Sequence, residues 1–365
     1  MTEQRQQETR YVASDAGPVP GMKRFSHEAM ATTFEILIVH EEERYARQAA
    51  SAAFAEVDRL EQELSRYVEN SDVARINSLP AGEPLVLGLD TFECLKISAR
   101  IYAETDGAFD ITIGSLLRCW RKDDGTPRTP PDEELENARQ LTGTDLMHLD
   151  EDEHTVVLSA SPVQVDLGGV GKGFAVDRVA ELLREWSIET ALVSGGYSSV
   201  LALEAPILKN KGGPVPSPSA ALRINSVEGT PSLRGWPLTL SHPADRSRVL
   251  ARPHLCGAAL SGSGVQKGGH IISPRTGRPI SGKLAAWSGA PDAATADALS
   301  TAFMIMSPEE IDKYCADNPR TRAMVIMNER EGETEKEKIL RFGRWEDVTG
   351  SEPNKGMMPS PRGSY

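Results

Sequence analysis

The segment at residues 165–177, VDLGGVGKGFAVD, constrains the fold of this chain more than any other. An apolar stretch runs into glycines at positions 168, 169, 171 and 173, and apolar residues then recur at helical spacing. Glycines allow a ligand to approach the backbone closely, and a helix beginning near Lys172 points its unsatisfied N–H groups and positive dipole end toward the same place. The segment therefore predicts a turn suited to phosphate. It matches neither the dinucleotide-binding fingerprint nor a P-loop, and the alternative is a glycine-rich turn that holds no ligand.

The remaining patterns alternate between strands and helices without the strict order of a parallel α/β protein. Strands are expected at 33–39, 156–159, 163–167, 190–194, 200–203 and 322–327, and helices at 41–64, 90–105, 133–141, from about 172, at 292–306 and after a capping box at 307–310. We expect 156–159 and 163–167 to pair as a hairpin, and 190–194 to pair with 200–203. Hairpins interspersed with helices favour an α+β fold with mixed, largely antiparallel sheets.

Composition divides the chain into one large domain with polar ends. Residues 1–21 and 350–365 are polar and rich in Pro, Gly and Ser, and we expect disordered tails there. Residues 205–235 include the sequence KNKGGPVPSPS, which is typical of an inserted flexible loop. Residues 22–349 should then form a single domain that carries this insert.

Charge and hydrophobicity exclude several function classes. The net charge is −13, which argues against a nonspecific grip on nucleic acid or on an anionic membrane. No apolar run is long enough for a signal-peptide core or a membrane span, so we expect a cytoplasmic protein. The four cysteines match no zinc or disulfide spacing.

A second pattern is Asp297 and Thr301 in TADALST. Four residues apart on a helix, the two side chains share a face and could offer two hard oxygen ligands to Mg²⁺, which completes its shell with water and phosphate. Alone, the pair is more often a solvated helix face. It gains meaning only beside a phosphate site.

Two further segments could carry chemistry. His270 lies in GGHIISPRTGRP, where a glycine-flanked imidazole could accept a proton at neutral pH, although a surface-loop histidine is an equal alternative. The segment TDGAFDITIG, at 105–114, reads by itself as a glycine turn with a capping Asp before an apolar strand.

Taken together, these segments resemble the FAD:protein FMN transferases of the ApbE flavin transferase family. The resemblance is collinear from Met30 to about Met306. Its landmarks are MATTFEI (30–36), SRYVENSDVARIN (65–77), TDGAFDITIGSLLRCW (105–120), VDLGGVGKGFAVD (165–177), SGG (194–196), HIISPRTGRP (270–279) and TADALSTAF (295–303).

The resemblance implies an enzyme that binds FAD with Mg²⁺ and transfers FMN to a threonine of another protein, releasing AMP. Carried over by motif position, the residues contacting FAD would be Met30, Tyr67, Ala108, Phe109, Asp110, Lys172, Phe174, His270 and Ile271. The metal would be held by the carbonyl of Gly171 and the side chains of Asp297 and Thr301. We assign His270 as the base that activates the threonine hydroxyl. The acceptor protein would carry a motif of a small residue followed by Ala and Thr.

The chain also departs from the family pattern. Ser273 and Gly269 stand where Asp and a second histidine are common, Tyr197 stands where Asn or Asp is common, and Gly171 replaces a usual alanine. The segment before His270 is short. Two alternatives therefore stay open: an Mg²⁺-dependent FAD pyrophosphatase that yields FMN and AMP, and an FAD-binding protein without turnover. A scaffold without a ligand would leave the coincidence of the motifs unexplained.

Overall fold

The computed structural model describes residues 13–14, 19, 21–122, 124–204, 235–245, 247–265, 271–331 and 334–345. Most of the expected tails and nearly all of the expected insert lie outside these ranges. Within them, Ala13 and Ser14 form a short strand, β1, that pairs with β9 (Trp236–Ser241). No helix of the described residues is long and apolar enough to cross a membrane.

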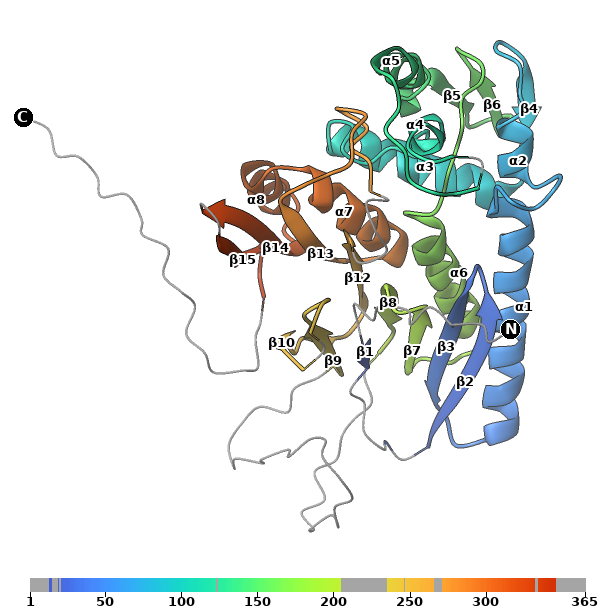
Figure 1. Cartoon of the computed structure of the whole chain (residues 1–365). Helices are drawn as coiled ribbons and strands as arrows, with labels where there is room; N and C mark the ends of the chain where they lie inside the picture. The colour runs from blue at the N-terminus through green and yellow to red at the C-terminus, as the bar shows by residue number, and fades with distance from the viewer. Residues whose placement is uncertain are drawn as a thin grey trace, which may run out of the picture.

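A sheet of eight antiparallel strands forms the centre of the protein (Figure 1). In spatial order the strands are β15 (Thr334–Phe342), β14 (Arg322–Glu331), β13 (Lys283–Ala290), β12 (Ala258–Gly264), β8 (Ser199–Ala202), β7 (Ala191–Gly195), β3 (Thr32–Val39) and β2 (Met22–Ala29). The α+β expectation is confirmed, including the pairing of β7 with β8.

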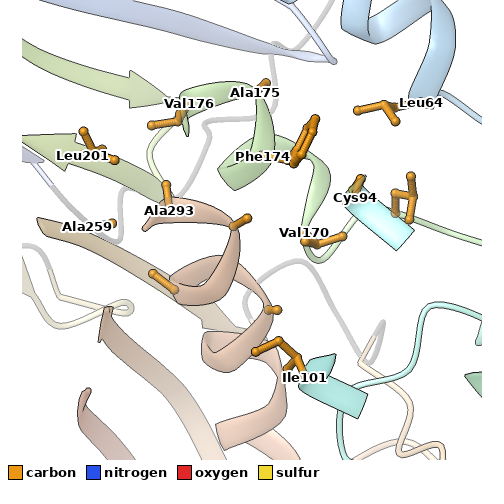
Figure 2. Packing of buried hydrophobic residues seen from close by; sticks show 14 of the residues in the cluster. Leu64, Cys94, Ile101, Val170, Phe174, Ala175, Val176, Leu201, Ala259 and Ala293 are labelled. Carbon is orange, nitrogen blue, oxygen red and sulfur yellow. The ribbon is translucent and has the colours of Figure 1, made fainter. Parts of the chain in front are cut away.

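Helices cover one face of this sheet. They are α1 (Glu43–Leu64), α6 (Gly171–Glu185) and α7 (Ala293–Ile305), and α3 (Leu89–Glu104) packs against them. Figure 2 shows buried side chains of α6 and α7 beside Leu201 of β8 and Ala259 of β12, with Cys94 and Ile101 of α3 on the other side of these two helices. Helix α7 is apolar on nearly all sides, and almost all of its residues are buried, because it lies between the sheet and the other helices. The helix that carries Asp297 and Thr301 is therefore a rigid core element.

The opposite face of the sheet is covered by β strands. Strand β9 pairs with β10 (Val249–Ala251) and β11 (His254–Leu255), and their apolar side chains pack against the large sheet. Trp236 and Trp287 are the largest side chains in this second core, and both are fully buried. The two cores fix the sheet from both sides.

Most of the remaining elements gather at one end of the molecule (Figure 1). They are α2 (Asp72–Ile76), α4 (Gly114–Cys119), α5 (Asp132–Gln140) and a sheet of β4 (Pro84–Val86), β6 (Thr155–Leu158) and β5 (Met147–Asp150). Helix α8 (Pro308–Asp317) instead lies beside β14 and β15. The capping box at Ser307 and Glu310 is confirmed, with Pro308 in the first helical turn.

Two local expectations are wrong. The segment 163–167 forms no hairpin with β6, because its backbone groups are bonded elsewhere: the N–H of Val165 donates to Asn77 and that of Asp166 to the carbonyl of Ile111. The apolar residues after the DGAFD turn form a turn that leads into α4 instead of a strand. The strands that the sequence did not predict are β1, β2, β4, β5, β9, β10, β11, β12, β13 and β15.

Candidate active site

The glycine turn ends at the first residue of α6, as the sequence predicts. Asp166 holds the turn in shape: one carboxylate oxygen accepts the N–H of Gly168 at 2.8 Å, and the other lies 3.0 Å from the guanidinium of Arg66. Gly173 lets α6 approach α7, because a Cβ there would lie 2.2 Å from the carbonyl oxygen of Ala293. The missing side chain therefore brings the N-terminus of α6 against α7.

Asp297 lies at this close contact and is only 3% exposed. Its Oδ2 accepts the backbone N–H of Gly173 at 3.1 Å and lies 3.8 Å from Nζ of Lys172. Lys172 also donates to the carbonyl of Gly168 at 3.1 Å. The structure thus brings together the two patterns that the sequence left 120 residues apart, the glycine turn and the Asp–Thr pair.

Thr301 lies one helical turn after Asp297 on α7 and faces the glycine turn. Its Oγ1 is 3.2 Å from Oγ of Ser263 on β12. A Cβ at Gly169 would lie 3.4 Å from Thr301 Oγ1 and 3.2 Å from Cε2 of Phe109. Phe109 and Thr301 therefore lie on two sides of the glycine turn. A glycine at position 169 fits between them, whereas a larger residue would be crowded.

The DGAFD turn is anchored by its second acid. Oδ1 of Asp110 accepts three hydrogen bonds: from the N–H and hydroxyl of Thr112 and from the hydroxyl of Thr144, at 2.7–2.8 Å. Burial raises the pKa of Asp110 although these bonds act in the opposite direction. Asp110 therefore stabilises its own turn and caps no helix, since the N-cap of α4 is Ile113. Ala108 and Phe109 are buried beside it.

Met30 lies in the two-residue turn between β2 and β3. Met30 and Ala31 both have positive φ, 50° and 56°, which is the geometry of a hairpin turn that normally favours Asn and Gly. The adjacent Gly196, at φ 65°, is packed so closely that a Cβ would lie 2.3 Å from Oγ1 of Thr32. Strained backbone held by close packing is frequent at ligand sites. The turn lies at the same end of the sheet as Ser263, because Gly195 pairs with Ser199, which pairs with Ser261.

Tyr67 is the most exposed of the candidate residues, at 82%. Its hydroxyl accepts from Arg66 at 2.6 Å, and the guanidinium of Arg66 lies 4.8 Å from its ring centroid. Because Arg66 also pairs with Asp166, it connects Tyr67 to the glycine turn. Phe174 and Ile271 are buried.

His270 lies outside the described residues, so its orientation stays a prediction. The loop that follows it is described and is fixed at Arg275, which donates to the carbonyls of Thr105 and Asp106 at 2.7 and 2.9 Å and to Glu310 at 2.7 Å. The indole N–H of Trp120 donates to the carbonyl of Gly277 at 2.7 Å. The loop is thereby attached to the DGAFD turn and to α8.

The oxygen atoms here suit a magnesium ion. The candidate ligands are the buried carboxylate of Asp297, the hydroxyl of Thr301 and the backbone carbonyl of Gly171, which keeps a lone pair free of the helix hydrogen bond. All three are hard oxygen ligands, and Mg²⁺ needs few ligands from the protein. No group of three or more His, Cys, Asp or Glu side chains in the described part of the chain could hold a metal. A metal at this site would therefore depend on substrate phosphate and water for the rest of its shell.

Comparison with known proteins identifies the family. Residues 30–326 match the profile of the ApbE family. This chain belongs to the ApbE family. The FAD:protein FMN transferase of Klebsiella pneumoniae is 27% identical over 341 residues, which is 87% of each chain, and that of Escherichia coli K12 is 28% identical over 294 residues, or 76% of each. The ApbE protein of Thermotoga maritima superimposes with a TM-score of 0.69 at 26% identity, covering 84% of this chain and 94% of that one.

Sequence reasoning missed three residues that shape this site in an ApbE protein. Arg66 and Arg275 stand next to recognised motif residues, but their partners are distant in sequence. Asp177, the last residue of the glycine motif, accepts the N–H groups of Ala293 and Ala294 at 2.7 and 2.8 Å, so it caps α7 from α6. The sequence signal that could have revealed Asp177 is the acid that ends the glycine motif.

Proposed function

We propose that this chain catalyses Mg²⁺-dependent transfer of FMN from FAD to a threonine of an acceptor protein, with AMP as the leaving group. The convergence of Lys172, Asp297 and Thr301 at the N-terminus of α6 is the observation that carries the proposal. A diphosphate needs positive charge and N–H donors at one place, and this protein of net charge −13 concentrates them there. The relatives from Klebsiella pneumoniae and Escherichia coli are named FAD:protein FMN transferases, which supports transfer of FMN from FAD to a protein.

The residues divide the work by their position. Lys172 and the first N–H groups of α6 would bind the diphosphate, while Phe109 and Phe174, with Met30, Tyr67, Ala108, Asp110 and Ile271, would hold the flavin and adenosine parts. Gly171, Asp297 and Thr301 would hold Mg²⁺, which when bound neutralises charge on the phosphates. Arg66 orders the glycine turn through Asp166.

His270 would act as the general base. The threonine oxygen attacks the phosphorus of the FMN half, the bond from that phosphorus to the oxygen of AMP breaks, and the threonine proton passes to His270. A neutral hydroxyl is a poor nucleophile, which is why a base is required. The partner that we propose is a cytoplasmic acceptor whose motif ends in a small residue, Ala and Thr, reacting with the single domain at 22–349.

The test measures both products of the reaction. Purified protein is incubated with FAD and Mg²⁺, with and without an acceptor domain bearing the threonine motif, and AMP and acceptor mass are followed. We expect the acceptor to gain FMN and AMP to appear, and a chelator to abolish both. AMP and free FMN regardless of acceptor would establish the pyrophosphatase alternative, and bound FAD without products would leave a flavin binder.

Two variants separate binding from chemistry. Asp297→Asn keeps an oxygen that can accept the N–H of Gly173 but removes the charge, so transfer should fall at least about 100-fold while the melting temperature changes little. His270→Ala should keep FAD binding and lose transfer. Undiminished transfer by His270→Ala would remove His270 from the role of base.

A further inference from the structure

The carboxylate of Asp297 interacts with more than one donor. Its Oδ2 accepts the backbone N–H of Gly173 at 3.1 Å and lies 3.8 Å from Nζ of Lys172. The side chain of Asp297 is 4% exposed, whereas that of Lys172 is 25% exposed. Asp297 also belongs to α7, almost all of whose residues are buried. Lys172 is therefore the partner that can move when another group binds to the carboxylate.

Lys172 is directed toward the same place as the candidate metal ligands. Its Nζ donates to the carbonyl of Gly168 at 3.1 Å, so the ammonium group lies at the glycine turn. Thr301 faces the same turn, because a Cβ at Gly169 would lie 3.4 Å from its Oγ1. A divalent cation held by Asp297 and Thr301 would therefore be a close neighbour of the ammonium group.

One carboxylate cannot balance two cations. An ammonium group and a divalent ion that share Asp297 repel each other, and this repulsion is stronger where water is partly excluded. Asp166, the other acid at the turn, is already paired with Arg66 at 3.0 Å. Lys172 should therefore oppose a divalent cation at Asp297 as long as no further anion is present.

A diphosphate removes this conflict. It carries two negative charges, and its oxygens accept hydrogen bonds from an ammonium group and also bind divalent cations. The N-terminus of α6 lies at the same turn and favours an anion there. With a diphosphate at the turn, Lys172 and the metal can bind the same anion and no longer compete for Asp297.

We propose that Lys172 couples the binding of a divalent metal to the binding of FAD. It weakens metal binding in the absence of FAD and ceases to do so once the diphosphate is bound. The inference rests on the proposed function for the location of FAD, and adds that the metal is held more tightly with FAD than alone. By linkage, the factor by which FAD raises the affinity for metal equals the factor by which metal raises the affinity for FAD.

The test measures metal binding and requires no turnover. Mn²⁺, which takes the same oxygen ligands as Mg²⁺, is titrated into the full-length protein, and free Mn²⁺ is followed by electron paramagnetic resonance. The titration is repeated with FAD and with riboflavin, which has the same ring system and no phosphate, and Mn²⁺ binding to FAD without protein is measured separately. We expect FAD to raise the affinity for Mn²⁺ at least about tenfold and riboflavin to leave it unchanged.

Lys172→Met nearly keeps the length of the side chain and removes its charge. Without FAD, this variant should bind Mn²⁺ at least about fivefold more tightly than the natural protein, because the competing cation is gone. The factor by which FAD raises the affinity for Mn²⁺ should fall by a similar amount. Lys313→Met removes the same charge from an exposed position of α8 and should change neither quantity. Asp297→Asn should abolish tight Mn²⁺ binding, which assigns the signal to this site.

Four outcomes would overturn the proposal. They are unchanged or weaker Mn²⁺ binding by Lys172→Met without FAD, an equal change in Lys313→Met, equal effects of riboflavin and FAD, and tight Mn²⁺ binding that persists in Asp297→Asn. Circular dichroism establishes that each variant is folded, and the comparison of FAD with riboflavin on the natural protein applies even if Lys172→Met does not fold. The proposed function fails separately, because a protein that forms neither AMP nor flavinylated acceptor can still show this coupling, and an active transferase can lack it.

Discussion

Asp177 shows how a single carboxylate can connect two helices. It belongs to α6, yet both of its oxygens accept N–H groups from the first turn of α7. The same first turn is capped by Asp292, whose side chain accepts the N–H of Thr295. Because α7 carries Asp297 and Thr301, Asp177 fixes these two residues relative to the glycine turn on its own helix.

The titration of Asp177 makes stability depend on pH. Burial raises its pKa to about 7, above the value of an exposed carboxyl, so the folded state holds a proton that the unfolded state has already released. Its contribution to the free energy of unfolding is then fully present below the unfolded pKa, near 4, and is lost as the pH rises through about 7.

We therefore predict that the stability difference between the natural protein and Asp177→Asn varies with pH. The natural protein should lose stability relative to this variant between about pH 4 and pH 7, as measured by urea unfolding. Asp152→Asn, which removes an exposed carboxylate from the turn after β5, serves as the control. A difference that stays constant, or that grows with pH, would contradict the raised pKa.

At the scale of elements, the long helices were predictable, whereas the short helices α2 and α4 and several strand pairings were not. Helices α1, α3 and α7 begin and end within a few residues of their predicted limits, because apolar residues recur at helical spacing throughout them. The segment 163–167 looks like a strand, but its partner Asn77 lies 88 residues away, which local patterns cannot reveal. Strand β15, TEKEKILRF, is a charged edge strand whose apolar alternation is weak.

The same limit applies to the candidate site. Glycine spacing and the Asp297–Thr301 pair predicted which segments matter, because each motif is local. Arg275 bonds to the carbonyls of Asp106 and Thr105, which lie 169 and 170 residues earlier in the chain. Its role as a clamp that holds its own loop against the DGAFD turn is therefore visible only in the structure. Arg275 is half-buried beside the carbonyls to which it donates, whereas the neighbouring Arg278 is exposed and pairs with Asp132 at 3.3 Å.

We predict that Arg275→Ala lowers transfer at least about tenfold, because three hydrogen bonds that position the loop after His270 are lost. Arg278→Ala, an arginine of the same loop, should leave transfer within about twofold, since exposed ion pairs contribute little. Single-turnover rates and FAD affinity are measured for both. Equal effects of the two variants would contradict the clamp.

Three serines on adjacent strands form a row inside the sheet. Ser199 on β8 pairs with Ser261 on β12, which pairs with Ser288 on β13. All three are buried, and their hydroxyls have no hydrogen-bond partner among the described residues. Burying an unsatisfied hydroxyl costs about 1–3 kcal/mol, whereas alanine at the same position has no polar atom to satisfy.

Ser288→Ala should therefore raise the free energy of unfolding by about 1 kcal/mol. Ser300→Ala on α7 is the contrasting variant, because its hydroxyl bonds to Ser263 and to the carbonyl of Asp297, and it should destabilise the protein by a similar amount. Denaturant unfolding with a constant m-value measures both changes. Loss of stability in Ser288→Ala would mean that a buried water satisfies the row.

At the scale of the whole molecule, the segments before and after the expected insert belong to the same folded domain. Glu204 and Trp236 stand just before and just after residues 205–235, and the indole N–H of Trp236 donates to the carbonyl of Glu204 at 3.0 Å. Trp236 is fully buried in the second core, so its position does not depend on the insert. The two ends of the insert are thus already adjacent.

We predict that replacing residues 206–233 by a short Gly-Ser linker leaves the fold intact. The linker has to span only a short distance, and a shorter loop costs less closure entropy, so the melting temperature should change by no more than about 3 °C. FAD affinity and AMP formation should stay within about twofold, because none of the candidate site residues lies in the deleted range. Calorimetry and product analysis measure these quantities, and a linker of equal length and neutral composition separates the effect of loop length from that of sequence. Loss of FAD binding in the shortened chain would show that the insert is part of the catalytic domain, whereas a raised KM for the acceptor alone would place it on the acceptor's path.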